Sequence, residues 1–101
     1  IAADCSATEY RKTVEAAWLK KLQDFRPQLV LISAGFDGHR LDPMAELNLE
    51  TEDYRWLTEM LVSVAHDHSN DRIISTLEGG YHLKALAEGV AAHLEVLNAV
   101  Y

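Results

Sequence analysis

Apolar side chains near the start of the chain recur three or four residues apart and form one stripe, the spacing of an amphipathic helix. The preceding Ser6-Ala7-Thr8-Glu9 matches a capping box, in which Ser6 caps the helix and Glu9 reaches back. Pro27 ends the pattern because proline disfavours the α conformation at the residue before it. We predict a helix over residues 7–25. Its apolar stripe consists of Tyr10, Val14, Ala17, Trp18, Leu22 and Phe25.

Two later apolar runs have the pattern of strands. Residues 29–32 read Leu-Val-Leu-Ile without alternation, as expected for a strand that is buried on both faces of a parallel sheet. Residues 73–77 form a second apolar run. The segment 34–50 between them is a long loop, and loops of roughly 15 residues usually have a function or are disordered. Its Gly, Asp and Pro content indicates ordered turns.

Two further helices complete the pattern. We expect Thr51 to cap the first of them, with Glu52 and Asp53 complementing the positive end of its dipole. This helix ends at the polar run 66–71, and the last helix covers residues 83–99. The inward stripe of the middle helix consists of Leu57, Met60, Leu61, Val64 and Ala65. The core face of the last helix consists of Leu83, Leu86, Val90, Leu94 and Leu97.

The predicted order is helix, strand, helix, strand, helix, so the two strands should be parallel and joined by a right-handed crossover. Two parallel strands make a poor sheet, because independent stability generally needs about three or more strands and parallel ones need cover on both faces. The sequence therefore indicates an α/β fold that is one part of a larger parallel sheet. The chain begins at Ile1 without a methionine, which agrees with this expectation.

Composition narrows the possible classes of protein. The 101 residues suffice for one small domain, and 49% hydrophobic with 25% charged residues is ordinary for a globular chain. Nine basic residues lie scattered among sixteen acidic ones, for a net charge of −7, which argues against a nucleic-acid-binding surface. No apolar stretch approaches the roughly 20 residues of a membrane span, and no signal peptide is visible. Cys5 is the only cysteine, so we expect no internal disulfide and a cytoplasmic location.

Polar residues that suit chemistry follow both predicted strands. Asp37, His39 and Asp42 come after the first strand, and carboxylates with an imidazole suit zinc or a similar divalent ion. By spacing alone, the stronger interpretation is that they are ordinary turn residues, since Asp-Gly and Asp-Pro are common in turns. Tyr81 comes after the second strand and a Gly-Gly pair. Its phenol either packs beside the turn or points into a cleft that the glycines let a ligand approach.

Together these segments resemble the zinc-dependent deacetylase family, which includes histone deacetylases, acetylpolyamine amidohydrolases and bacterial acetoin-utilisation proteins. The resemblance covers essentially the whole chain, including the leading helix, and Gly-Phe-Asp before the Asp-Pro pair is most similar to the class II and bacterial branch. It implies the three-layer, parallel-sheet arginase–deacetylase fold. The motifs that carry it are FRPQLVLIS, SAGFDGHRLDPM, LNLETEDY and LEGGYHLKALAEGVAAHL.

The resemblance also implies a role for individual residues. Asp42 matches the third zinc ligand of the family, and Tyr81 matches the tyrosine that hydrogen-bonds the substrate carbonyl and then the oxyanion. Gly79 and Gly80 match glycines that line the pocket near the acetyl group, and Met44 lies where the family has a residue of the substrate tunnel. Losing one donor such as Tyr81 typically costs about 2.7–4 kcal/mol of barrier. The counterparts of Asp37 and His39 are not zinc ligands, so for them we expect a role in organising the loop.

The sequence departs from the family pattern in two ways. His82 stands where the family usually has Asn or Asp, which suggests a weaker helix cap. The upstream elements that supply the other zinc ligands (an Asp-x-His) and the general base (paired histidines) have no counterpart here; Asp37-Gly38-His39 has the first spacing, but it belongs to the later motif, whose residues at these positions are not zinc ligands. We therefore expect residues 1–101 to be the C-terminal third of a single deacetylase catalytic domain. Alone, the chain should hold no catalytic Zn²⁺, which needs about three protein ligands, and should be inactive.

The remaining histidines have ordinary interpretations. His66-Asp67-His68 should be a solvated helix end, although an adventitious metal there is the alternative. His93 should be a surface or boundary residue. Tyr54, like the two tryptophans, should pack between helices rather than contact a ligand.

The sequence thus predicts a fragment of an enzyme that hydrolyses N-acetyl amides, with an acetylated lysine, polyamine or small metabolite as substrate. One alternative is another arginase-like metal hydrolase acting on a different C–N bond, and a second is a non-catalytic module that retains the fold for binding. The sequence upstream of Ile1 distinguishes them, because an Asp-x-His element with paired histidines would favour the enzyme. Both strands lack partners at their outer edges, so we expect the isolated chain to self-associate or to be only marginally folded.

Overall fold

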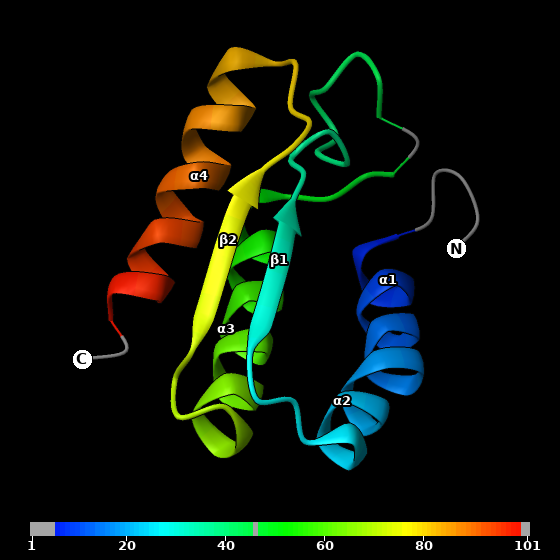
Figure 1. Ribbon diagram of the computed structural model, residues 1–101. Helices are drawn as coiled ribbons and strands as arrows, with labels where there is room; N and C mark the ends of the chain where they lie inside the picture. The colour runs from blue at the N-terminus through cyan, green and yellow to red at the C-terminus, as the bar shows by residue number, and fades with distance from the viewer. Residues whose placement is uncertain (1–5, 46, 100–101) are drawn as a thin grey trace.

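The computed structural model describes residues 6–45 and 47–99; Ile1 and Cys5 lie outside these ranges. It shows two parallel strands with the helices around them, in the predicted order (Figure 1). In this part of the chain, no helix is long and apolar enough to cross a membrane. In chain order the elements are α1 (Ala7–Val14), η1 (Glu15–Leu19), α2 (Lys20–Phe25), β1 (Val30–Ala34), α3 (Thr51–His68), β2 (Ile73–Leu77) and α4 (Leu83–Asn98).

The first helical segment confirms the predicted helix over residues 7–25, with the π-helical stretch η1 joining α1 to α2. Ser6 caps it as predicted, because its Oγ accepts a hydrogen bond from the Glu9 N–H at 3.2 Å. The segment ends where Arg26 adopts the left-handed conformation (φ 55°, ψ 64°) directly before Pro27. The local pattern therefore sets both ends of this helix.

The two strands pair in parallel, with a register that runs from Val30 opposite Ile73 to Ala34 opposite Leu77. Figure 1 shows α3 behind the strands, so that the β1–α3–β2 connection is the expected right-handed crossover. The bounds of β2 are as predicted, whereas β1 begins one residue later than Leu29 and continues to Ala34.

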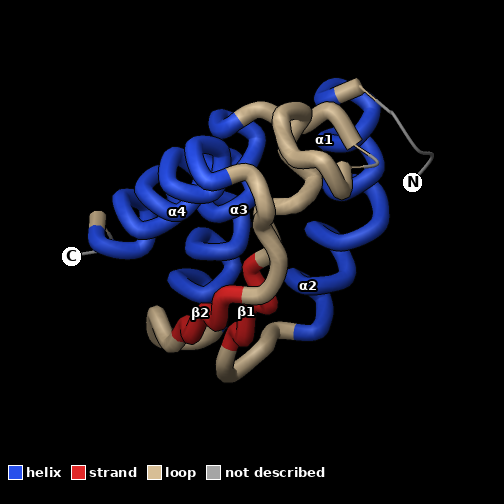
Figure 2. The backbone as a smooth tube through the Cα atoms, turned by 90° about the horizontal axis from the view of Figure 1, so that it is seen from above, coloured by secondary structure: helices blue, strands red, loops and turns tan. Residues whose placement is uncertain are grey.

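The helices lie on one side of the sheet (Figure 2). Along β1, Val30 and Ala34 are buried on the side of the helices, each 8% exposed. On the other face, the register partners Leu31 and Ile74 are 69% and 57% exposed. The continuous apolar pattern correctly predicted the two strands. The expected burial on both faces is not met within the described residues, where the helices cover one face only.

The core forms where the end of β1 meets the start of α3. Phe36 and Tyr54 pack at a centroid distance of 5.0 Å, and Ala34 and Leu49 complete the buried cluster. This cluster lies beneath the carboxyl ends of both strands. It therefore supports the loops that carry the candidate chemistry.

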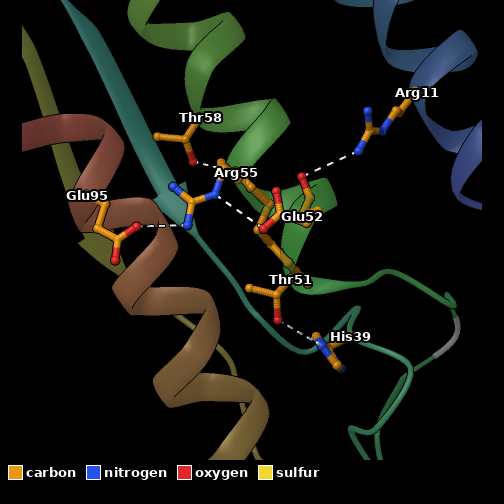
Figure 3. Close-up of polar contacts among 8 residues, drawn as sticks. Arg11, His39, Thr51, Glu52, Arg55, Thr58 and Glu95 are labelled. Atoms are coloured by element: carbon orange, nitrogen blue, oxygen red, sulfur yellow. Dashed lines mark hydrogen bonds and ion pairs between the residues drawn. The ribbon is translucent and has the colours of Figure 1, made fainter. Parts of the chain in front are cut away.

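The prediction that Thr51 caps α3 is wrong, because the cap is Glu50. The Glu50 side chain accepts from the Asp53 backbone, and the Asp53 carboxylate accepts from the Glu50 N–H at 2.8 Å. Two carboxylates thereby satisfy two backbone donors reciprocally, and Asp53 also pairs with Arg11 Nε of α1 at 2.9 Å. The Thr51 hydroxyl instead lies 3.4 Å from His39 Nε2 in the loop (Figure 3).

The predicted core face of α4 is also wrong in part. Leu83 and Leu94 are 82% and 55% exposed, although Leu86 and Val90 do pack against the core cluster. The buried face carries small residues instead, which let the helix approach α3 and Phe36 closely. Arg55 Nη2 of α3 and Glu95 Oε2 of α4 form an ion pair at 2.8 Å beside this contact (Figure 3). The buried residues of α4 are Ala85, Gly89, Ala92 and His93.

His93 is therefore a buried residue, not the surface or boundary residue that was predicted; it is 6% exposed. Its Nδ1 lies 2.9 Å from Thr58 Oγ1 and its Nε2 lies 2.8 Å from Ser75 Oγ. Because the Thr58 hydroxyl donates to the Tyr54 carbonyl at 2.7 Å, Nδ1 carries the proton and Nε2 accepts from Ser75. A neutral imidazole thus joins α3, α4 and β2, and burial lowers the pKa of His93.

We expect this buried imidazole to make stability depend on pH. The unfolded state binds a proton below the ordinary histidine pKa of 6.5, whereas the folded state resists it, so the free energy of unfolding falls as the pH falls through and below 6.5. The slope should not exceed about 1.4 kcal/mol per pH unit. His66 has the opposite effect, because its pairing with Asp71 raises its pKa.

Comparison with His93→Leu isolates the contribution of His93. At about pH 8 this substitution should lower the free energy of unfolding by about 1–3 kcal/mol, because the Ser75 hydroxyl loses its partner. Urea unfolding followed by circular dichroism should show the difference between the two proteins shrinking towards about pH 5. A difference that stays constant over this range would contradict the prediction.

Candidate functional site

The two segments singled out by the sequence meet at the carboxyl edge of the sheet, where Figure 1 shows the chain leaving both strands. Parallel pairing continues beyond the strands, because the Glu78 N–H donates to the Ala34 carbonyl at 2.9 Å and the Phe36 N–H donates to the Gly79 carbonyl at 2.8 Å. The loop after β1 and the Gly-Gly corner after β2 are therefore held side by side. Such edges are where α/β sheets bind ligands.

Asp42 is the centre of this arrangement and is 6% exposed. Its Oδ2 accepts hydrogen bonds from the Tyr81 N–H at 2.6 Å and the His82 N–H at 3.1 Å. Its Oδ1 accepts from the Met44 N–H at 2.8 Å. One carboxylate thus joins the loop after β1 to Tyr81 and His82, the two residues directly before α4.

These donors keep Asp42 ionised. Burial by itself raises the pKa of the carboxyl group, but the backbone N–H groups of Tyr81, Met44 and His82 outweigh it, so that the pKa lies below its ordinary value. Oδ2 accepts two hydrogen bonds and Oδ1 only one. Oδ1 therefore retains capacity for one further interaction, and an ionised oxygen of this kind suits a divalent cation such as zinc.

Asp37 and His39 do not join Asp42 in a ligand set. His39 is 2% exposed, with Nδ1 accepting from the Leu41 N–H at 3.2 Å, which confirms the expected loop-organising role. The Asp37 carboxylate packs against Gly79. Across residues 6–45 and 47–99, no three His, Cys, Asp or Glu side chains gather where they could hold a metal ion. In this part of the chain, Asp42 is suited to supply one ligand only.

Gly79 and Gly80 are required by the path of the chain. A Cβ atom on Gly79 would lie 2.9 Å from Asp37 Oδ2, and one on Gly80 would lie 2.7 Å from Leu86 Cδ1. Gly80 also has φ of 148°, which residues with a side chain rarely adopt. Because both residues lack a side chain, Asp37 and α4 can lie close to this corner. The role of the two glycines in a substrate pocket stays a prediction.

Tyr81 and Met44 carry the exposed side chains of the site, at 59% and 67% exposed. The backbone N–H groups of Tyr81 and Met44 both donate to Asp42, so this one carboxylate positions the two residues that carry the exposed side chains. Within the described residues, the Tyr81 hydroxyl makes no hydrogen bond. It is accessible to a ligand at this edge.

Two residues of the site were assigned other roles from the sequence. The Tyr54 hydroxyl, expected only to pack between helices, accepts from the Gly38 N–H at 3.1 Å, and burial raises its pKa well above the ordinary value. His82, expected to be a weaker cap, does cap α4, because its Nδ1 accepts from the Ala85 N–H at 3.2 Å. The role of His82 could be predicted from the sequence, because a ring nitrogen at the cap position can accept a hydrogen bond. No sequence spacing indicates that the Tyr54 hydroxyl contacts Gly38.

Comparison with known proteins identifies relatives of this chain. The sequence model of the Histone deacetylase domain family matches residues 1–97. The type-2 histone deacetylase 2 of Dictyostelium discoideum is 40% identical over 102 residues, an alignment that covers 83% of this chain and 6% of that protein. The polyamine deacetylase HDAC10 of Homo sapiens is 40% identical over 74 residues, covering 73% of this chain and 10% of that protein.

A solved structure shows the same fold. The crystal structure of the HDA15 HD domain superimposes with a TM-score of 0.86 and 27% sequence identity, covering 98% of this chain and 27% of that one. The chain therefore spans less than a third of each of these relatives. Its two-stranded parallel sheet and helices correspond to part of the arginase–deacetylase fold. With nearly its whole length matched by the family's sequence model, the chain belongs to the histone deacetylase family.

Proposed function

We propose that this chain supplies one zinc ligand, Asp42, and one oxyanion donor, Tyr81, to a zinc-dependent deacetylase that hydrolyses N-acetyl amides. The observation that carries the proposal is the hydrogen bond of 2.6 Å from the Tyr81 N–H to Asp42 Oδ2. It brings together two residues that are 39 positions apart and come from two separate family motifs. The family of this chain supports the reaction class.

The chemistry assigned to each residue follows from its position. Bound zinc would polarise the amide carbonyl as a Lewis acid, with Asp42 Oδ1 as one of its ligands. The Tyr81 hydroxyl would donate to the carbonyl oxygen, and this hydrogen bond strengthens as negative charge develops on the oxygen. Asp42 would fix the backbone of Tyr81 at the same time. The remaining zinc ligands and the general base would come from residues outside the described ones.

The rim of the site bears on the substrate. Met44 is apolar and 67% exposed, so it offers no carboxylate that would select a polycation. Gly79 and Gly80 leave room for the backbone to approach a small acetyl group. We propose an acetylated amine of the acetyl-lysine or acetylpolyamine type, with the side chain of Met44 against its aliphatic part; this part of the rim does not select between the two.

Substitutions in a complete deacetylase domain that carries this sequence test the two roles. Tyr81→Phe should leave zinc bound and lower kcat by about 10²–10³-fold, because it removes a donor used mainly in the transition state. Asp42→Asn should lower the zinc content, because a neutral amide is a poorer ligand. Metal analysis and steady-state kinetics measure both effects.

A matched control is Asp24→Asn, which makes the same change at an exposed carboxylate that pairs with Lys20. It should leave zinc content and kcat unchanged. If Tyr81→Phe loses metal while Asp42→Asn keeps both metal and rate, the assignment of roles is wrong. If both variants keep full activity, neither residue takes part in the reaction and the proposal is overturned.

The isolated chain should have no zinc-dependent deacetylase activity. Asp42 is a single ligand, whereas a catalytic zinc needs about three from the protein. An acetyl-lysine reporter assay with added zinc, compared with the complete domain, tests this directly. Zinc-dependent turnover by the purified chain would overturn the prediction.

We further propose that the isolated chain self-associates. The uncovered face of the sheet presents Leu31 and Ile74, and an apolar groove of about 920 Å³ lies between the first helical segment, β1 and α3. Exposed apolar faces and open strand edges favour association. Light scattering at micromolar concentration should show species larger than a monomer. Leu31→Lys should reduce their population, and a monodisperse monomer of the unaltered chain would contradict the proposal.

A further inference from the structure

The direction of the Tyr81 side chain depends on its backbone. The side chain is 59% exposed, and within the described residues its hydroxyl has no hydrogen-bond partner. Gly79 is held by the hydrogen bond from the Phe36 N–H to its carbonyl, whereas Gly80, directly before Tyr81, has no side chain and adopts φ of 148°. Further restraint on Tyr81 comes from contacts of its own backbone and from the residue that follows.

His82 provides that following restraint through three hydrogen bonds. Its N–H donates to Asp42 Oδ2 at 3.1 Å, the same oxygen that accepts from Tyr81. Its Nδ1 accepts from the Ala85 N–H at 3.2 Å, and its carbonyl accepts from the Leu86 N–H at 2.8 Å. His82 is thus tied to the Asp42 loop on one side and to the first turn of α4 on the other.

Of these three hydrogen bonds, the one from the Ala85 N–H to His82 Nδ1 is made by the side chain, so it alone depends on which residue occupies position 82. In the neutral ring, Nδ1 is the acceptor and the proton is on Nε2. The cap holds His82 at φ −94° and ψ 111°, an extended conformation outside the helix. This geometry aims the His82 N–H and the Tyr81 N–H at one carboxylate oxygen. Without the cap, the first turn of α4 frays and the corner gains other conformations.

We propose that His82 is a positioning residue for Tyr81: by capping α4, it keeps the backbone of Tyr81 bonded to Asp42 and its phenol directed to the reacting amide. The proposal rests on the proposed function of Tyr81. It goes beyond that function by assigning a role to a residue to which the proposed function gives no contact with substrate or metal.

The kinetic test uses the complete deacetylase domain with an acetyl-lysine peptide. His82→Ala should lower kcat by about 2- to 30-fold, the range expected for loss of a helix cap, with KM and zinc content unchanged. His82→Asn should restore kcat, because asparagine is among the best capping residues. A loss that His82→Asn does not rescue would overturn the proposal.

Ser6→Ala is the matched control. Ser6 caps α1 through a hydrogen bond of the same length, 3.2 Å to the Glu9 N–H, on an element that carries none of the proposed site residues. Its removal should loosen α1 to a similar extent and leave kcat unchanged. An equal loss of kcat in Ser6→Ala would show that any weakened helix end lowers activity, and would reject positioning by His82.

A double-mutant cycle separates positioning from general structural damage. In the Tyr81→Phe background, His82→Ala should cause no further loss of kcat, because the hydroxyl that it positions is already absent. The same fold-loss in both backgrounds would overturn the proposal.

Hydrogen exchange gives a readout that does not depend on the reaction. His82→Ala should speed exchange of both the Ala85 and the Tyr81 amides by about 2- to 30-fold, and His82→Asn should restore protection. Faster exchange at Ala85 alone would mean that His82 caps the helix without positioning Tyr81. If Tyr81→Phe retains full kcat, the proposed function of Tyr81 fails, and the exchange of its amide still decides whether His82 positions it.

Discussion

The site depends on one buried carboxylate that accepts three backbone N–H groups. Asp42 lies after β1, but its donors include Tyr81 and His82, which follow β2. A buried carboxylate without such partners would be costly, so the loop and the corner each stabilise the conformation of the other. Because charge-assisted hydrogen bonds are shorter and stronger than neutral ones, this contact fixes the proposed ligand and the proposed oxyanion donor relative to each other.

The packing beneath the site follows the same principle, in which buried polar groups are paired across elements. The Tyr54 hydroxyl accepts from Gly38 in the loop, while its ring packs on Phe36. His93 joins Thr58 and Ser75 between the helices and the sheet. These contacts need α4 to lie close to the core, which explains why small residues occupy its buried face. The loops of the site therefore rest on a support whose polar side chains are paired between elements.

The uncovered sheet face and the incomplete set of proposed zinc ligands have one explanation in common. Leu31 and Ile74 form an apolar surface on a strand pair that needs cover, and Asp42 is the one proposed ligand for a metal that takes several. Both are met if further elements of a larger domain pack on that face and bring the other ligands. The chain matches less than a third of a homologous domain structure, which leaves room for such elements in our proposal.

The sequence by itself determined the element order, the parallel pairing and the two site segments, because these depend on local periodicity and on motifs that are contiguous in the chain. It also predicted Ser6 as a cap and His39 as a loop residue. It was wrong about Thr51 and about the buried face of α4, where neighbouring side chains decide between candidates of similar local preference. Leu83 and Leu94 have the spacing of a core stripe, yet the close approach of α4 to Phe36 selects the small face.

Only the tertiary structure decided which polar groups meet. The burial of His93, the hydroxyl of Tyr54 on the loop and the convergence of Tyr81 and His82 on Asp42 all join residues that are distant in sequence. No local pattern encodes such pairings, because they arise from the register of two strands and the angle of one helix. For the same reason His82, a departure from the family pattern by sequence, becomes a working helix cap once its ring nitrogen faces the first turn of α4.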